Sequence, residues 1–437
     1  MKVRIFILVL FSAVSLLGQL QQTAPVEQSG GAWFNPVTLA SEFFDRGNFV
    51  NYYAFANAVY DSFAPVVNNN GQSVNNGGFG FDVGGGVGAY HAWSKSSLAL
   101  NYSGSYRNYS ASYLGNGTNQ NLSLTFNRRL ARRWSLGTGV YAGTVMYGTG
   151  YFGAQAVTNG NVQLNPFSVN NRYASGSVSV SYQQSRRLSY TFSGSIFLQR
   201  FSYSSAIGTT GGSGAVSALY RVTSRTSVSG DYYHSYYAYQ LGAGNASMDG
   251  ANFTLYHHFG NLWSVWASGG ITHTNVAGFF FVPVGIITGT GTVTGVIRVP
   301  YNVSAVSPAF QGTVARALRR SQISVSGGQN VVSGNGYYLA SRNQFINGFY
   351  SRSYRRSNAG FGGYWSRLHT LVQSTGYDYN TSGFSANYGY VVMRHVSANA
   401  RYDFIRYGTI GSNSSVSDNR FAFGISLSSQ SIPLTLY

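Results

Sequence analysis

The chain has 437 residues, of which 55 are glycine, 8 are proline and none is cysteine. Only 9% of the residues are charged while 16% are aromatic, and the mean hydropathy is -0.07. The charges are too few for an ordinary soluble surface, and the hydropathy is too low for a helical membrane protein. The lack of cysteine excludes disulfide frameworks and thiolate metal sites.

The N-terminus has the pattern of a secretory signal peptide. Lys2 and Arg4 precede an apolar stretch at 5–17, and we place the signal peptide at residues 1–22. Residues 23–44 show no alternation and are expected to form a short periplasmic lead-in segment. No later apolar run approaches the roughly 20 residues that a membrane-spanning helix needs.

From residue 45 to residue 437 the dominant pattern is a two-residue alternation. Leu98, Leu100, Tyr102 and Tyr106 share one face of such a segment, while serine, asparagine and arginine occupy the other. This is a strand with one apolar and one polar side. The segments recur with about ten residues each, which at roughly 3.3 Å per residue crosses a hydrocarbon layer when the strand is tilted. We interpret 45–437 as an outer-membrane β-barrel.

The connections between the segments are alternately short and long. Short turns such as Ala131-Arg132-Arg133 carry basic residues, whereas longer connections such as 65–78 are rich in Asn, Gly and Ser. The sequence therefore predicts an all-β fold: a transmembrane antiparallel up-and-down β-barrel of about 18 strands, or 16 as the alternative, with short periplasmic turns and longer outer loops. The predicted strands are 47–63, 79–93, 97–112, 119–130, 134–148, 172–184, 188–203, 213–223, 227–240, 248–259, 262–275, 308–319, 322–334, 343–356, 358–373, 381–393, 395–410 and 417–428.

Two further segments have patterns of their own. The long loop from Asn275 to Ser307 reads as an extra hairpin, which could extend its neighbouring strands, fold into the pore or contact a partner. The chain ends on Tyr437 after alternating apolar residues, which resembles the signal that the barrel-insertion machinery recognises. Because Pro433 belongs at a strand edge or end, we expect the last six residues to form a periplasmic tail.

In these features, residues 45–437 resemble outer-membrane β-barrel proteins of the porin-like kind. The resemblance rests on architecture and not on a family-specific motif. It implies a location in the bacterial outer membrane and passive or weakly selective diffusion of small solutes. The expected partners are outer-membrane lipid, small solutes, the insertion machinery and a possible second copy in a homo-oligomer, with no nucleic acid.

Because alternate residues of a strand face opposite sides of the barrel wall, we assign the polar face of each strand to the lumen. Arg401 and Asp403 share that face two residues apart, so they could pair and cancel. The net charge of +18, carried almost entirely by arginine, favours anionic solutes, although these arginines could instead anchor the periplasmic rim. Inward tyrosines could stack on sugar rings or pack in the interior. The pore-lining candidates are Asn101, Arg107, Tyr141, Arg221, Asp231, Tyr233, Arg401 and Asp403.

Other functions stay open beside the channel. They are an outlet for acidic exopolysaccharide, an outer-membrane hydrolase, and a structural or adhesive barrel. We predict no enzyme activity, cofactor or metal site. The glycine-dense stretch 78–88 lacks the Lys-Ser/Thr pair of a phosphate loop and is better explained by small residues facing a crowded lumen. His257 and His258 are adjacent on a strand and therefore face opposite sides.

Overall fold

The computed structural model describes most of the chain from residue 48 onward. The described residues are 48–62, 65–67, 73–75, 77–110, 116–145, 171–201, 208–260, 262–288, 291–332, 340–371, 378–410, 415–429 and 432–433. The predicted signal peptide and lead-in segment lie outside them. Among the described residues, no helix has the length and apolar character needed to cross a bilayer.

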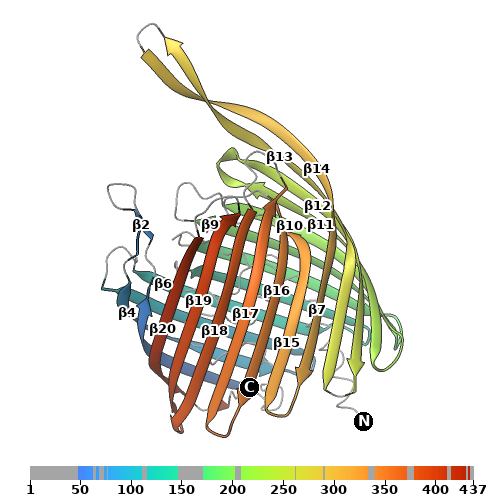
Figure 1. Cartoon of the computed structure of the whole chain (residues 1–437). Helices are drawn as coiled ribbons and strands as arrows, with labels where there is room; N and C mark the ends of the chain where they lie inside the picture. Colours follow the sequence, from blue (N-terminus) through green and yellow to red (C-terminus); the bar gives the residue numbers. More distant parts are fainter. Residues whose placement is uncertain are drawn as a thin grey trace.

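The described strands form a closed antiparallel barrel (Figure 1). Each wall strand pairs with the next along the chain, and the last pairs with the first from Tyr53↔Ser428 to Asp61↔Arg420. The sheet has 19 strands, of which the short β21 (Ile432–Pro433) continues the last wall strand, so the wall itself contains 18. The prediction of an 18-strand all-β barrel is confirmed.

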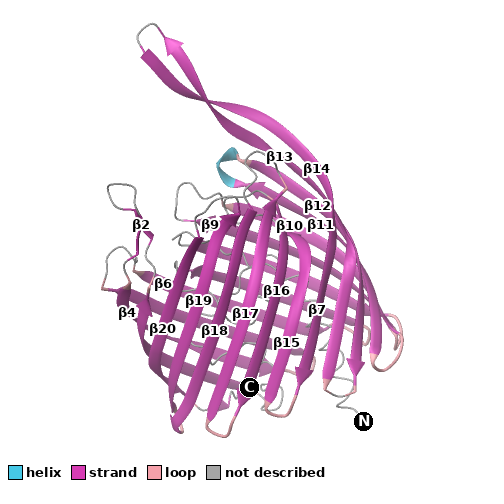
Figure 2. Ribbon diagram, in the orientation of Figure 1, coloured by secondary structure: helices cyan, strands magenta, loops and turns pink. Residues whose placement is uncertain are grey.

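The wall strands are β1 (Phe49–Asp61), β4 (Gly78–Ala92), β5 (Ser96–Tyr109), β6 (Gly117–Arg129), β7 (Trp134–Val145), β8 (Asn171–Gln183), β9 (Leu188–Phe201), β10 (Thr209–Arg221), β11 (Thr226–Tyr239), β12 (Gly244–Phe259), β13 (Trp263–Thr288), β14 (Gly291–Ala317), β15 (Ser321–Val332), β16 (Ser341–Ser353), β17 (Ser357–Thr370), β18 (Asp378–Met393), β19 (Val396–Ile410) and β20 (Ser415–Ser428). Outside the wall lie the hairpin β2 (Pro65–Val67) and β3 (Ser73–Asn75) and, among the described residues, the 3-10 turn η3 (Gln240–Gly242), drawn in cyan in Figure 2.

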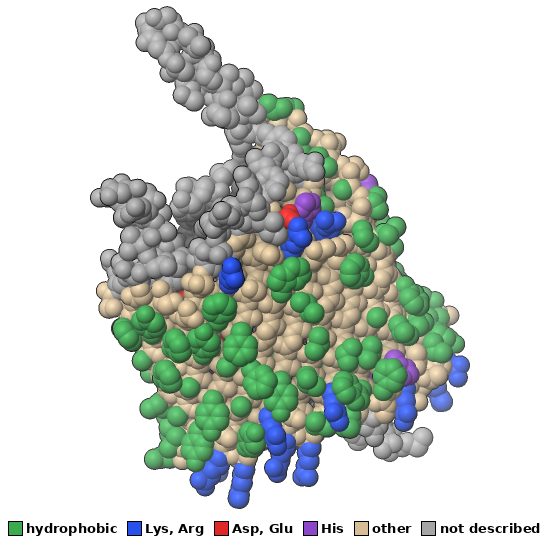
Figure 3. Space-filling model, viewed as in Figure 1, with side chains coloured by type: hydrophobic (Ala, Val, Ile, Leu, Met, Phe, Trp, Pro, Cys, Tyr) green, Lys and Arg blue, Asp and Glu red, His purple; other side chains and the backbone are tan. Residues whose placement is uncertain are grey.

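The alternation of the sequence becomes an apolar exterior and a polar interior. Phe79 and Ile196 point outward with 70% and 69% of their surface exposed, whereas Asp82 and Thr254, on the inward face, are 1% and 0% exposed. Figure 3 shows apolar side chains spread in a broad band over the outer surface, with basic side chains along the lower end. Such a band is stable only against lipid.

The short turns are tight because their own side chains hold them. In the β8–β9 turn, the Ser185 hydroxyl accepts hydrogen bonds from the backbone N–H groups of Arg187 and Leu188, at 3.2 and 3.1 Å. In the β10–β11 turn, Thr223 does the same for Arg225 and Thr226. Hydroxyl side chains favour turns for this reason. These turns define the periplasmic end of the barrel.

The loop from Asn275 to Ser307 is an extension of two wall strands. β13 and β14 stay paired from Trp263↔Arg316 to Thr288↔Gly291. β12 stops pairing with β13 at Gly278, so beyond this level the hairpin pairs with itself and rises away from the barrel (Figure 1). Of the three predicted arrangements, the extension of neighbouring strands is the observed one.

The C-terminal prediction is wrong for two residues. Ile432 and Pro433 form β21, which pairs with Val50 and Phe49 at the start of β1. The register shifts by one residue from that of β20, so the chain passes a bulge before it resumes pairing. Proline is tolerated here because it lies at the very end of the strand. Leu434 to Tyr437, including the proposed insertion signal, lie outside the described residues.

The glycines of β4 make room for inward aromatic rings from β1. A Cβ atom on Gly86 would lie 2.6 Å from the ring of Tyr53, and one on Gly84 would lie 2.8 Å from the ring of Phe55. Such distances are too short for any side chain, so only glycine fits beneath these rings. The interpretation of this stretch as small residues in a crowded interior is confirmed.

We therefore predict that Gly86→Val destabilises the barrel by about 1–3 kcal/mol, the usual cost of overpacking. The measurement is urea unfolding of the refolded protein in lipid vesicles, followed by tryptophan fluorescence. Gly230→Val is the matched control, because a Cβ atom on Gly230 would have nothing within 4 Å. Equal stability of the two variants would contradict the packing argument.

Candidate functional site

The inward face of the barrel is lined by polar side chains. Serine and threonine hydroxyls bridge neighbouring strands, as between Ser195 and Ser213 at 2.7 Å and between Thr254 and Ser268 at 2.9 Å. Because inward and outward positions alternate strictly, every predicted pore-lining residue has the parity of this face. The candidate site is therefore the interior wall.

One side of this wall carries a chain of paired charges. Arg107 on β5 lies with its Nη2 2.8 Å from Oδ2 of Asp82 on β4, and both side chains are buried. Arg107 also donates to the Tyr109 hydroxyl at 3.4 Å, and that hydroxyl donates to Asp61 on β1 at 3.3 Å. Buried charges need such partners because water no longer solvates them.

The chain of charges continues on β20 and β19. Arg420 donates through Nε to Asp61 at 2.9 Å and through Nη2 to Asp418 at 2.6 Å. Arg401 lies with its Nε 2.8 Å from Oδ2 of Asp403, so the pairing considered from the sequence is observed. We call these residues of β19, β20, β1, β4 and β5 the charged ladder. Its cations are held by carboxylates instead of facing the lumen unpaired.

The other predicted residues occupy scattered positions. Asn101 of β5 stands opposite Gly88 of β4 and Ser123 of β6. Tyr141 of β7 stands opposite Ser123 of β6 and Ser175 of β8. Arg221 is at the periplasmic end of β10. The structure thus brings Arg107, Arg401 and Asp403 into the charged ladder and leaves the rest outside it.

Tyr233 and Asp231 are neighbours on β11 and are both engaged. The Tyr233 ring lies over Gly250, and its hydroxyl is 2.8 Å from Oγ1 of Thr272, two strands away. The Asn252 side-chain amide donates to Asp231 at 3.0 Å, and no described basic side chain pairs with this carboxylate. The Tyr233 ring therefore serves interior packing.

Acidic and basic side chains are balanced on the inward face of the described strands. The two sets are equal in number. The inward cations are Arg107, Arg129, Arg221, Arg401 and Arg420, and the inward acids are Asp61, Asp82, Asp231, Asp403 and Asp418.

Much of the excess positive charge lies at the periplasmic end. The short turns carry many cations and, within the described residues, no acid. We call this set the periplasmic rim. It consists of Lys95, Arg132, Arg133, Arg186, Arg187, Arg225, Arg319, Arg320, Arg355, Arg356 and Arg394. Many of the arginines therefore lie in periplasmic turns, which is the alternative position considered from the sequence.

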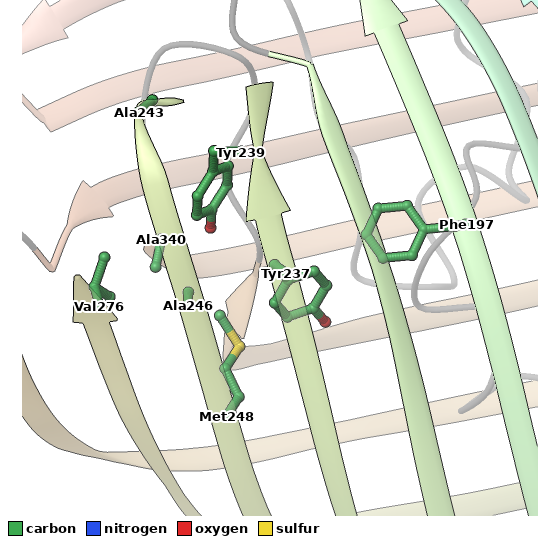
Figure 4. Close-up of a cluster of buried hydrophobic side chains, with 8 residues drawn as sticks. All are labelled: Phe197, Tyr237, Tyr239, Ala243, Ala246, Met248, Val276 and Ala340. Atoms are coloured by element: carbon green, nitrogen blue, oxygen red, sulfur yellow. The ribbon is translucent and has the colours of Figure 1, made fainter. Parts of the chain in front are cut away.

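A cluster of buried apolar side chains, shown in Figure 4, lies on the side of the barrel opposite the charged ladder. Phe197 of β9 and Tyr237 of β11 have ring centroids 5.5 Å apart. In the ring of 18 strands, β12 stands nine positions from β1, half-way round. Both features lie toward the outer end, because Asp61 ends β1 and Tyr239 ends β11. The members of the cluster are Phe197, Tyr237, Tyr239, Ala243, Ala246, Met248, Val276 and Ala340.

Sequence reasoning missed much of the charged ladder. Asp61, Asp82, Asp418 and Arg420 were not among the predicted residues, although each has the inward parity of its strand. The available signal was the rarity of acids, since a carboxylate on the polar face of a barrel strand needs a cation nearby. Within the described part of the chain, no group of three or more His, Cys, Asp or Glu side chains could hold a metal ion.

Comparisons with known proteins found similarity in structure alone. No family model matches the sequence, and no curated protein matches it. The Pseudomonas aeruginosa outer membrane protein OpdK is 11% identical, with a TM-score of 0.43, covering 87% of this chain and 98% of that one. P. aeruginosa OccK2 in complex with glucuronate is 10% identical, with the same TM-score and coverage. A BenF-like porin from Pseudomonas fluorescens Pf-5 is 11% identical, with a TM-score of 0.44, covering 88% and 99%.

Likenesses at this level carry no conclusion about solutes. The architecture rests on the barrel itself: a closed wall of 18 strands, an apolar exterior and a polar interior. Closed barrels with this division are the β-structures that span membranes. The chain is therefore a membrane-spanning β-barrel, the architecture of bacterial outer-membrane proteins.

Proposed function

We propose that the barrel is a channel for passive or weakly selective diffusion of small solutes, with a preference for anionic or sugar-like ones. The observation that carries the proposal is the polar inward face of a wall of 18 strands. Barrels of 16 to 18 strands enclose an aqueous channel, whereas smaller ones fill with side chains. No catalytic step is assigned to this chain.

The preference for anions is supported by the periplasmic rim. The inward charges of the described strands balance, so a ring of unpaired arginines inside the lumen is not the source. The rim places many cations around one mouth without a described acid among them. A mouth of one sign of charge raises the local concentration of ions of the opposite sign. Selectivity of this origin is weak and falls as salt screens the rim.

Passage of sugar-like solutes is supported by the hydroxyl groups of the inward face. Half-buried side chains such as Ser181 and Thr191, whose hydroxyl oxygens lie 3.0 Å apart, line this face. Hydroxyl groups both donate and accept hydrogen bonds, as the hydroxyl groups of a sugar do.

One observation favours a second candidate, an outlet for acidic exopolysaccharide. A polyanion arriving from the periplasm would meet the basic rim first. The two functions differ in the size of what passes, because a general channel admits small solutes from either side.

The refolded protein in a planar bilayer is predicted to give a stable open conductance. Under a salt gradient, its reversal potential should show a weak preference for chloride over potassium that declines at high ionic strength, since the rim is exposed to solvent. Replacing Arg132, Arg133, Arg186 and Arg187 by Gln should reduce the preference and keep the conductance.

The control for this experiment replaces the pair Arg401 and Asp403 by Gln and Asn. It removes one charge of each sign inside the barrel, so the reversal potential should stay the same. A silent barrel, or one that prefers potassium, would contradict the channel proposal or its anion preference, respectively. Liposome swelling with a hexose and a hexuronate then ranks uncharged and anionic sugars.

A second prediction concerns Asp231, an inward acid with no described basic partner. Asp231→Asn keeps an acceptor for the Asn252 amide and makes the lumen more positive. We expect the chloride preference to rise by about twofold, because a unit charge about 10 Å from the ion path is worth about 0.4 kcal/mol in water. The readout is again the reversal potential.

The matched control is Asp249→Asn. Asp249 lies on the adjacent strand, β12, but faces outward, where Tyr232 and His234 contact it at 2.9 and 2.8 Å. The same change of charge on the lipid side should leave the reversal potential unchanged. A shift of equal size in both variants would mean that the inward position of Asp231 is irrelevant to permeation.

A further inference from the structure

A group of charged side chains lies on the outside of the barrel, at the upper limit of the apolar band. Figure 3 shows basic, acidic and histidine side chains gathered there. Three neighbouring strands contribute them: β16, β17 and β18. We call them the outer patch, which consists of Arg342, Gln344, Arg367, His369 and Asp378.

The strand register places the members of the outer patch side by side. Arg342 stands directly opposite His369, and Gln344 directly opposite Arg367. Asn380 of β18 stands opposite Arg367, so Asp378, two residues away on the same face, lies beside His369. All of these positions have the outward parity of their strands.

Asp378 fixes two of the basic side chains. The Nε of Arg367 donates to its Oδ2 at 2.7 Å, and the ring of His369 contacts its other oxygen. The Asp378 side chain is 9% exposed, whereas Arg367 is 40% and His369 37% exposed. The carboxylate therefore sits underneath, and the two basic side chains stay accessible above it.

Arg342 adds a cation without a carboxylate of its own. Within the described residues its Nε is buried and has no hydrogen-bond partner. Gln344 is held from the other side, since its amide donates to Gln329 at 2.8 Å and Gln329 donates to the Pro308 carbonyl at 2.8 Å. The outer patch thus combines two guanidinium groups with one carboxylate, and the Nε of Arg342 has no described partner.

The level of the outer patch relative to the lipid follows from the row beneath it. One step toward the periplasm, the outward positions of β16 and β17 are Ile346 and Trp365, directly opposite each other and 53% and 36% exposed. Tryptophan is enriched where the hydrocarbon layer meets the headgroups. The outer patch therefore lies at the headgroups of the outer leaflet, at the end opposite the short turns.

We propose that the outer patch binds a phosphate group of an outer-leaflet glycolipid, with the acyl chains of that lipid lying along Ile346 and Trp365. Guanidinium groups bind phosphate oxygens in a bidentate manner, and a preorganised pair binds better than a flexible one. The apolar row directly beneath argues for a lipid-borne phosphate over free phosphate. This inference is independent of what passes through the channel.

The other outward carboxylate among the described residues, that of Asp249, has different neighbours from those of Asp378. Asp249 is surrounded by Tyr232, His234 and, farther away, His273, and no arginine joins them. Of these two outward groups, only the outer patch contains more arginines than carboxylates.

The test is native mass spectrometry of the refolded full-length barrel in a neutral detergent, titrated with bis-phosphorylated lipid A. Wild-type protein is expected to retain one lipid, and Arg342→Gln to bind it about tenfold more weakly, as loss of a charge-assisted contact to phosphate predicts. Arg316→Gln is the matched control, because Arg316 also faces outward but stacks over Trp263 at the periplasmic end, 5.1 Å from the ring centroid. It should bind like the wild type.

Three results would overturn the proposal: unchanged binding by Arg342→Gln, equal binding of the same lipid without its phosphates, and displacement of the lipid by inorganic phosphate at equal concentration. The last would identify a free-phosphate site. Refolding of each variant is checked by its heat-modifiable mobility in electrophoresis. If Arg342→Gln does not refold, Arg342→Met keeps the aliphatic stem and replaces it in the same comparison.

Discussion

Closure of the sheet is the constraint on which the rest of this structure depends. Hydrocarbon offers no partner to a backbone N–H or C=O group, so an open edge in the bilayer would cost several kcal/mol for each such group. β20 removes that edge by pairing with β1, and β21 continues the seam past a one-residue bulge. An up-and-down barrel can close in antiparallel fashion only with an even number of strands, and 18 meets this condition.

Closure also decides what can lie inside. Side chains on the inner surface of a curved sheet converge, so large rings need small neighbours. The rings of Tyr53, Tyr233 and Tyr364 lie over Gly86, Gly250 and Gly383, on adjacent strands. In each pair, the glycine lets the aromatic ring lie flat against the barrel wall. Glycines at these positions thus keep aromatic side chains close to the backbone, as the interpretation of 78–88 as small residues facing a crowded lumen implies.

Sequence predicted the strands well because alternation and turn chemistry are local. Each strand repeats its pattern within itself, and Arg401 and Asp403 could be paired from sequence since they stand two residues apart on one strand. The rest of the charged ladder depends on register between distant strands: Asp61 and Arg420 meet across 359 positions of the chain. The long hairpin shows the same limit. The sequence indicated a hairpin there, but only the pairing of β13 with β14 shows that its strands continue those of the wall.

The distribution of charge follows from what burial costs. A cation enclosed in the wall without a partner would lose its hydration, so Arg107 and Arg420 stand beside Asp82, Asp61 and Asp418. The same rule holds outside, where Asp378 lies beneath Arg367. Unpaired cations are tolerated where water or phosphate reaches them, in the periplasmic turns and at the outer headgroups. A basic barrel of this kind is therefore nearly neutral along its walls and positive at its two membrane boundaries, which is where its charge can act on solutes and lipids.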